Sequence, residues 1–364
     1  MNEALSNLAD DFFKNSLDSS PTSAIMRGYK EYFDQIEELT ETRFDQNLKD
    51  LDKFEKRLKE INFDNLSNKE KVTYGMLEYA FGSNKDSLLD KSWEFGAGVS
   101  GFTGYLIDYN QQMFIPDLES ADLLLKRLEL YNQFFNQVSS VQKKGLNENR
   151  VATERNLLRT IDQIESYLKT SLEEDPLLLV NFSPEVSEQD VSSWKNKAKL
   201  IIESHVRPRV NSYLEQLKSE HLPKGRSDTN PGIMWIDGGD DIYLRSLRKF
   251  TGNKDITVKE VHETGLSEIK RLKKEFFEIG KNVFADVTTP EEVIHKMQTE
   301  PSMRFESKEQ MLQMAEDIIK RAYEPLSDWF TVFPKAPCNV LPVPEESEKH
   351  APPAYYYSPL PDGS

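Results

Sequence analysis

Five histidines are the first candidates for metal binding or proton transfer in this sequence. They are His205, His221, His262, His295 and His350. Two imidazoles on one helical face can share a metal when they stand three or four residues apart, and no two of these histidines do. His262-Glu263 begins like the zinc motif HExxH, but Leu266 stands where the second histidine would be. The sequence therefore predicts no metal-binding residue in this chain.

The spacing of His262 favours a structural role instead. It falls beside Val258 and Leu266 on the apolar side of a predicted helix. A buried imidazole is satisfied by one or two hydrogen bonds. We therefore predict that His262 is a core residue, and that His262→Leu is tolerated better than His262→Asp.

One glycine-rich segment has the form of a nucleotide-binding motif. Gly96-Ala97-Gly98-Val99-Ser100-Gly101 reads GxGxxG, which binds a dinucleotide only between a buried strand and a helix. The preceding SLLDKSWEF has too little apolar character for that strand. We predict a structural loop that binds no nucleotide.

Other catalytic patterns are missing from the sequence. It has no GxSxG elbow, no phosphate-binding GxxxxGK[ST] and no CxxC. Its acidic pairs are typical of solvated helix faces, because the chain has 62 acidic residues. Lone Cys338 excludes an internal disulfide and a cysteine zinc cluster, and we interpret it as packed or inert.

The composition limits the partners of this protein. The 364 residues carry a formal charge of -16, which repels nucleic acid and anionic membrane surfaces. The N-terminal MNEALSNLADDFF lacks the basic and apolar regions of a secretory signal, and no apolar run is long enough to span a bilayer. We expect a cytoplasmic protein with no nucleic-acid partner and no membrane partner.

Helical periodicity extends through most of the chain up to Trp329. One long stripe steps by three or four residues through Phe44, Leu48, Leu51, Phe54, Leu58 and Ile61. Predicted helix starts are Ser67 with Glu70, Thr257 with Glu260, Thr289-Pro290 and Ser307 with Gln310. Pro208 predicts a kink in the helix that starts near Ser187, and residues 222–243 are expected to be loop.

The last segment, 330–364, differs from the rest because it holds eight of the 18 prolines. Two extended segments, 339–343 and 354–358, fit it better than a helix. Asp362-Gly363 is a turn signal with no returning strand after it. We expect this chain to be the N-terminal part of a longer protein.

These patterns predict a mostly α fold: a multi-helix array forming one wall of a cleft, with a small β element near the C-terminus. We divide it into an N-terminal helical subdomain with the glycine-rich loop (1–115), a helical scaffold (116–330) and a proline-rich extended segment (331–364). That last segment would begin an incomplete catalytic-type subdomain.

Three segments resemble the bacterial family catalogued as domain of unknown function 885. They are IPDLESADLLLKRLELYNQFFNQV, WIDGGDDIYLRSLRKFTGNKDITVKEVHETGLSEIKRL and VFPKAPCNVLPVPEESEKHAPPAYYYSPLPDGS. That family is similar to zinc metallopeptidases of the thermolysin-like and carboxypeptidase-Taq-like group, which are mostly helical proteins with a deep cleft. In those proteins an HExxH helix supplies two zinc ligands and the catalytic glutamate, and a later acid supplies the third ligand.

The resemblance places the zinc motif after the tyrosine-rich strand, beyond Ser364. It implies zinc and a peptide substrate for the full-length parent, and no cofactor or catalytic residue in this chain, which alone would be inactive. It also implies that Ala354, Tyr355, Tyr356 and Tyr357 lie along the substrate, although the tyrosines could equally pack a sheet onto the helices. Two functions follow: the N-terminal scaffold of a zinc-dependent peptidase-like hydrolase, or a non-catalytic helical binding or structural protein.

Overall fold

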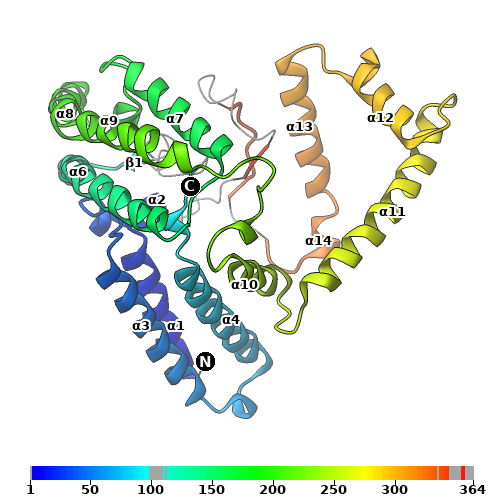
Figure 1. Cartoon of the computed structure of the whole chain (residues 1–364), viewed down its shortest axis with the longest axis horizontal. Coiled ribbons are helices and arrows are strands. Elements are labelled where there is room, and N and C mark those ends of the chain that lie inside the picture. Colours follow the sequence, from blue (N-terminus) through cyan, green and yellow to red (C-terminus); the bar gives the residue numbers. More distant parts are fainter. Residues whose placement is uncertain (1, 98–109, 111–112, 334–335, 344–353, 357–364) are drawn as a thin grey trace. The chain divides into compact units, whose positions relative to one another are not determined.

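A computed structural model describes residues 2–97, 110, 113–333, 336–343 and 354–356. The chain divides into two compact units, Met1–Gly252 and Asn253–Ser364. Helices dominate both units, so the predicted mostly α class is confirmed (Figure 1). The predicted segments 1–115, 116–330 and 331–364 follow local composition and stay predictions, as does the cleft.

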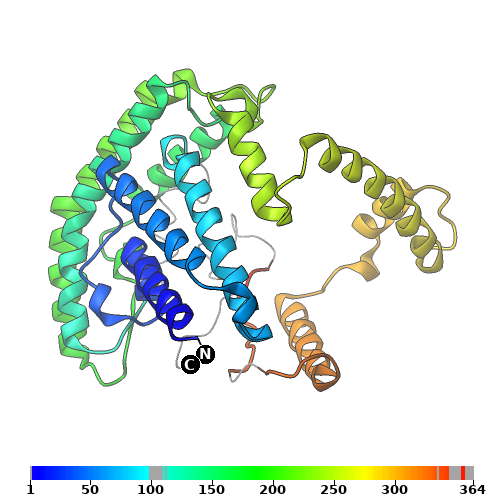
Figure 2. The same ribbon diagram turned by 90° about the horizontal axis from the view of Figure 1, so that it is seen from below.

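The first unit begins with three long helices that lie side by side (Figures 1 and 2). These are α1 (Glu3–Ser19), α3 (Glu41–Lys59) and α4 (Asn68–Asp90), with the short α2 (Pro21–Met26) after α1. Their apolar sides share one core, which contains Leu51, Phe54 and Leu58 of the predicted stripe. The Ser67–Glu70 capping box at the start of α4 is confirmed.

A second helical group lies on one side of α6 (Leu118–Asn147). It consists of α7 (Glu154–Lys169), α8 (Glu188–Ile201) and α9 (Arg207–Gln216). Buried side chains recur every third or fourth residue of α6, at Leu124, Leu128, Tyr131, Phe135 and Val138. Because that spacing keeps them on one side of the helix, α6 can pack against several neighbours at once.

Pro208 was expected to kink the helix that starts near Ser187, and the helix has an irregular turn just before this proline. A π-helical turn, Ile202–Val206, joins α8 to α9, and the Arg207 amide donates to the Ile202 carbonyl five residues back. Proline has no backbone N–H, so the regular helical ladder is interrupted there and a wider turn replaces it.

The small sheet lies elsewhere than expected. β1 (Phe114–Ile115) pairs in parallel with β2 (Asn181–Phe182). The C-terminal residues that the structure describes, 336–343 and 354–356, have no regular secondary structure. Prolines there remove backbone donors, and a strand forms only where another strand pairs with it.

One helix starts earlier than the sequence suggested. Residues 222–243 were expected to be loop, but α10 (Gly239–Thr251) already begins at Gly239. Gly238, with φ of +74°, precedes it in a left-handed conformation that a residue with a Cβ would adopt with strain.

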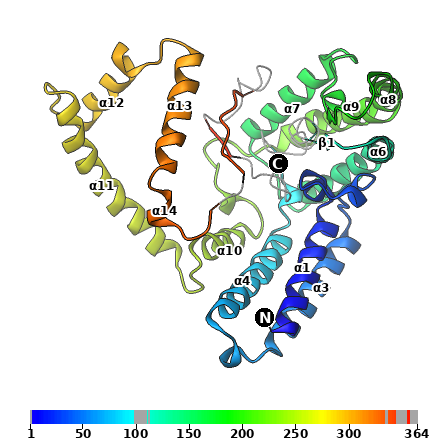
Figure 3. The ribbon, with the colours of Figure 1, turned by 180° about the vertical axis from the view of Figure 1, so that it is seen from behind.

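The second unit contains α11 (Val258–Val283), α12 (Pro290–Thr299), α13 (Lys308–Tyr323) and α14 (Leu326–Trp329), of which α12 packs against α11 (Figure 3). The capping boxes at Thr257 and Thr289 and the Ser307 cap confirm the predicted starts. Among its described residues only Gly280, Val287 and Val293 are buried. This unit therefore has almost no core.

The prediction that His262 is a core residue is wrong. His262 is exposed, and its neighbours Val258 and Leu266 are 48% and 56% exposed. The apolar side of α11 exists as predicted, but no described element of the second unit covers it near His262. Periodicity identifies an apolar side of a helix, whereas burial depends on what packs there.

Candidate functional site

The residues proposed to contact a substrate are exposed where the structure describes them. Tyr355 and Tyr356 are 46% and 70% exposed, and Ala354 is also exposed. Tyr357 lies outside the described residues. Nothing in their geometry distinguishes peptide contact from sheet packing, so the substrate role stays a prediction.

The chemistry-bearing residues of the sequence do not converge. Among the described residues, no group of three or more His, Cys, Asp or Glu side chains is arranged to hold a metal ion. Partly buried Cys338 donates its backbone amide to the Tyr323 hydroxyl at 3.1 Å. Of the glycine-rich motif, only Gly96 and Ala97 belong to the described residues.

A buried ion pair at Arg150 organises the part of the first unit around the start of the glycine-rich segment. Arg150 follows α6, and its Nε lies 2.6 Å from Oε2 of Glu94, whose side chain is 2% exposed. The two terminal nitrogens of Arg150 donate to the Asp237 carbonyl at 2.8 Å and the Asp90 carbonyl at 2.6 Å. One guanidinium thus joins the end of α4, the segment before Gly96 and the loop before α10.

The neighbouring carboxylates of α4 belong to the same cluster. The Asp90 carboxylate accepts from Arg245 of α10 at 2.5 Å. One helical turn earlier, burial raises the pKa of Asp86; nearby Asp90 adds to the rise and Arg245 opposes it. A carboxyl with a raised pKa is a candidate proton donor or acceptor, although ion-pair networks with a purely structural role produce the same shift.

Neighbouring backbone atoms leave no room for a Cβ at two glycine positions beside this cluster. A Cβ on Gly145 of α6 would lie 2.3 Å from the Glu94 carbonyl oxygen, and one on Gly239 would lie 1.9 Å from the Ile233 carbonyl oxygen. Both distances are far below normal contact. The glycines therefore allow α6 and α10 to approach these backbones closely.

A second buried ion pair lies between α7 and α9. The fully buried Asp175 carboxylate is 2.8 Å from Nη2 of Arg207, and it also accepts from the Leu177 amide at 3.0 Å. Burial, with the charge of Asp175, raises the pKa of the Tyr167 hydroxyl beside this pair. The tyrosine therefore stays protonated, which suits a structural contact rather than acid–base chemistry.

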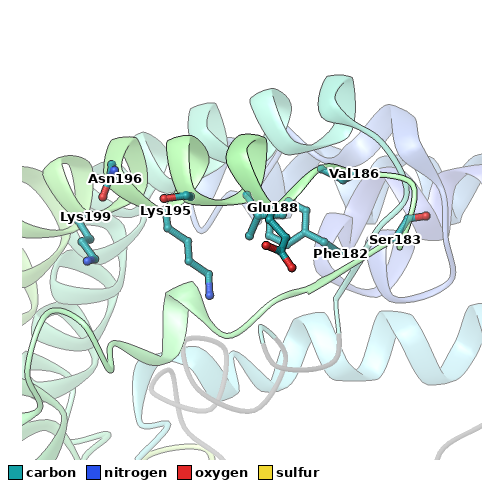
Figure 4. A pocket seen from close by; sticks show the side chains of 9 residues that line it. Phe182, Ser183, Val186, Glu188, Lys195, Asn196 and Lys199 are labelled. Carbon is teal, nitrogen blue, oxygen red and sulfur yellow. The ribbon is translucent and has the colours of Figure 1, made fainter.

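A surface groove runs along α8 (Figure 4). It has a volume of about 470 Å³, and its lining includes Phe182, Glu188, Lys195 and Lys199. Lys199 pairs with Glu173 at 3.1 Å. The charged side chains give the groove polar contacts for a small anion, but no His or Cys is among its described lining residues. The groove is a weak candidate for catalysis.

Sequence reasoning missed the buried acids because it treated acidic residues as solvated. Local context carried a signal in both cases. Glu94 stands between Trp93 and Phe95, and Asp175 precedes the apolar run Pro176-Leu177-Leu178-Leu179-Val180. A charge inside an apolar segment indicates a buried pair, since an unpaired charge there is costly.

Comparison with known proteins identifies the family. A profile for bacterial proteins of unknown function (DUF885) matches residues 21–364. The chain belongs to this DUF885 family. No curated protein matches it.

A solved structure shares the fold. The crystal structure of the "putative lipoprotein from Colwellia psychrerythraea" superposes with a TM-score of 0.82 and 17% identity, covering 99% of this chain. The present chain spans 65% of the length of that protein. Among the described residues of the present chain, no helix combines the length and apolar character that a membrane span requires.

Proposed function

We propose that this DUF885 chain is the N-terminal scaffold of a zinc-dependent peptidase-like hydrolase. The support is its sequence resemblance to such a family, together with the DUF885 match over residues 21–364. The zinc ligands and the catalytic glutamate would come from polypeptide beyond residues 1–364. The described residues would contribute walls and positioning, with the Arg150 cluster holding the first unit rigid.

Within this proposal, the tyrosine segment contacts the substrate. An extended peptide binds by backbone hydrogen bonds to another extended segment, and Ala354, Tyr355, Tyr356 and Tyr357 would supply that segment. We also propose a cytoplasmic location and the absence of nucleic-acid and membrane partners; the charge of -16 supports the second point, because it repels anionic surfaces.

The decisive experiment uses the longest natural polypeptide that the gene encodes. After dialysis it should retain about one zinc per chain and hydrolyse peptides, since metal-bound water supplies a nucleophile near neutral pH. Tyr356→Ala should raise KM for the peptide without changing zinc content, whereas Tyr243→Ala, an exposed tyrosine of the first unit, should not. Zinc-free protein without hydrolysis would contradict the proposal.

The second function, a non-catalytic helical binding or structural protein, is favoured by one observation. Large apolar side chains of α11 and α13 are exposed, including Leu272 at 51% and Ile318 at 48%. Surfaces of this kind commonly bind protein. Stoichiometric zinc would argue against this alternative.

A further inference from the structure

Helix α11 has a well-defined apolar face that the described structure leaves half exposed. We call it the α11 face. Val261 and Phe276 on this side are partly buried. Its other large apolar residues are between 48% and 59% exposed: Val258, Leu266, Ile269, Leu272, Ile279 and Val283. At 3.6 residues per turn they fall on one side of the helix.

The opposite side of α11 is entirely different in chemistry. Arg271 pairs there with Glu268 at 2.8 Å and with Glu275 at 2.7 Å, and Lys281 pairs with Glu278 at 3.0 Å. These pairs are in contact with solvent. A helix with one side made of ion pairs and the other of branched apolar residues is built to bury the second side.

The free energy available from covering the α11 face is large. Covering the exposed half of each Leu, Ile or Val side chain removes apolar area from water, and monomeric proteins rarely leave contiguous apolar patches above a few hundred Å² exposed. Within its own unit, α11 packs against α12, where Val293 lies directly on Gly280. The α11 face is therefore a surface on which another element can dock.

The occupant should be helical. The backbone donors and acceptors of α11 are used inside the helix, so an extended strand laid on it would find no backbone partners. A helix satisfies its own backbone and can place its side chains between those of α11.

We propose that a helical segment of the same natural polypeptide, outside residues 1–364, occupies the α11 face. The Colwellia psychrerythraea structure matches this fold over 99% of the present chain and uses 65% of its own length to do so, so the rest of that protein is further polypeptide. A corresponding additional segment in the natural polypeptide of the present chain could supply the helix that covers the α11 face.

This inference builds on the proposed scaffold role but does not depend on zinc. The test compares hydrogen exchange of α11 amides in the longest natural polypeptide and in chain 1–364, both in the presence of a chelator. We expect at least about tenfold slower exchange in the longer polypeptide, since tenfold corresponds to about 1.4 kcal/mol of opening free energy.

Two matched substitutions locate the effect. Leu272→Lys places a charge on the α11 face and should remove most of the slowing, while leaving the Tm of chain 1–364 unchanged. Ser267→Lys places the same charge on the exposed opposite side and should retain the slowing. Protected α11 in a natural polypeptide that holds no zinc would support this inference while contradicting the peptidase proposal. Unprotected α11 in a polypeptide that holds zinc would do the reverse.

Three outcomes would overturn the inference. One is a natural reading frame with no polypeptide outside residues 1–364. Another is equal exchange of α11 in the two proteins, or equal effects of the two substitutions. The third is a dimer of chain 1–364 that Leu272→Lys converts to monomer, which would assign the face to a second copy.

Discussion

Arg150 shows how a single buried charge can determine the position of several loops. Its guanidinium is 2.6 Å from a Glu94 oxygen and donates to two carbonyl groups from separate segments. Ion pairs of this kind add less net stability than their short distances suggest, because both charges lose water. Removing one partner is strongly destabilising, because the other charge remains buried and unpaired.

We expect Arg150→Met to lower the free energy of unfolding of the first unit by about 3–5 kcal/mol. Urea denaturation followed by far-UV circular dichroism would measure the change. The control is Lys14→Met, which breaks the ion pair between Lys14 and Asp18. Their side chains are 71% and 42% exposed, respectively. That substitution should change stability by less than about 1 kcal/mol. Equal effects of the two would show that the Arg150 cluster is solvated.

Two glycines should respond to alanine in opposite directions. Gly145→Ala places a Cβ 2.3 Å from the Glu94 carbonyl oxygen, so the gain in helix propensity should be outweighed by about 1–3 kcal/mol of overpacking. Gly75→Ala, in α4, meets no atom within 4 Å and should stabilise by about 0.5–1 kcal/mol. Thermal melts of both variants measure this. A stabilised Gly145→Ala would contradict the close approach of α6 to Glu94.

His262 marks the limit of residue-level prediction from sequence. Its helix and the apolar side of that helix were predictable, because both depend on local spacing. Its burial was not, because burial depends on elements distant in sequence. In chain 1–364 we now expect His262→Asp and His262→Leu to differ by less than about 0.5 kcal/mol in unfolding free energy, as exposed positions do.

At the scale of elements, the sequence predicted helix starts better than strands. The caps at Ser67, Thr257, Thr289 and Ser307 were correct because a cap is made by side chains within three residues of the helix start. The sheet was not predicted at its observed place, since β1 and β2 are two residues long and pair across 66 intervening positions. No local sequence pattern predicted the ion pair between Glu94 and Arg150.

The cap of α6 should make stability depend on pH. Asp117 accepts from the Ser120 amide at 2.8 Å, and the hydrogen bond from Lys30, with those from Ser120, holds its pKa at about 2. In the unfolded chain an aspartate has a pKa of about 3.9. The folded value is lower, so this contribution is complete above about pH 4 and is lost as pH falls through about pH 2.

Asp117→Asn keeps an oxygen that can cap the helix but removes the titrating charge. We expect the urea midpoint of this variant to fall less steeply than that of the wild type between pH 4 and pH 2. Lys30→Met should flatten the profile in the same direction because it removes the cationic partner. Parallel profiles for the wild type and Asp117→Asn would rule out the cap as a source of the pH dependence.

At the scale of the whole molecule, the two units differ in how much apolar surface they bury. The first has two cores, one among α1, α3 and α4 and a larger one around α6. The second buries three of its described residues. Amphipathic spacing is similar in both units, so spacing alone did not predict this difference. Periodicity indicates which side of a helix is apolar and carries no information about what covers it.

This difference predicts two levels of local stability in chain 1–364. Amides of α6 should open only by global unfolding, with protection of at least about a thousandfold if that unfolding costs 5 kcal/mol or more. Amides of α12 and α13 should exchange far faster, because few tertiary contacts hold these helices and isolated helices of 10 and 16 residues are marginal in water. Hydrogen exchange with mass spectrometry resolves the helices, and added urea provides the control: α6 protection should fall with urea, while α13 exchange should stay nearly constant. Equal, urea-dependent protection in both units would mean that the second unit is folded as firmly as the first.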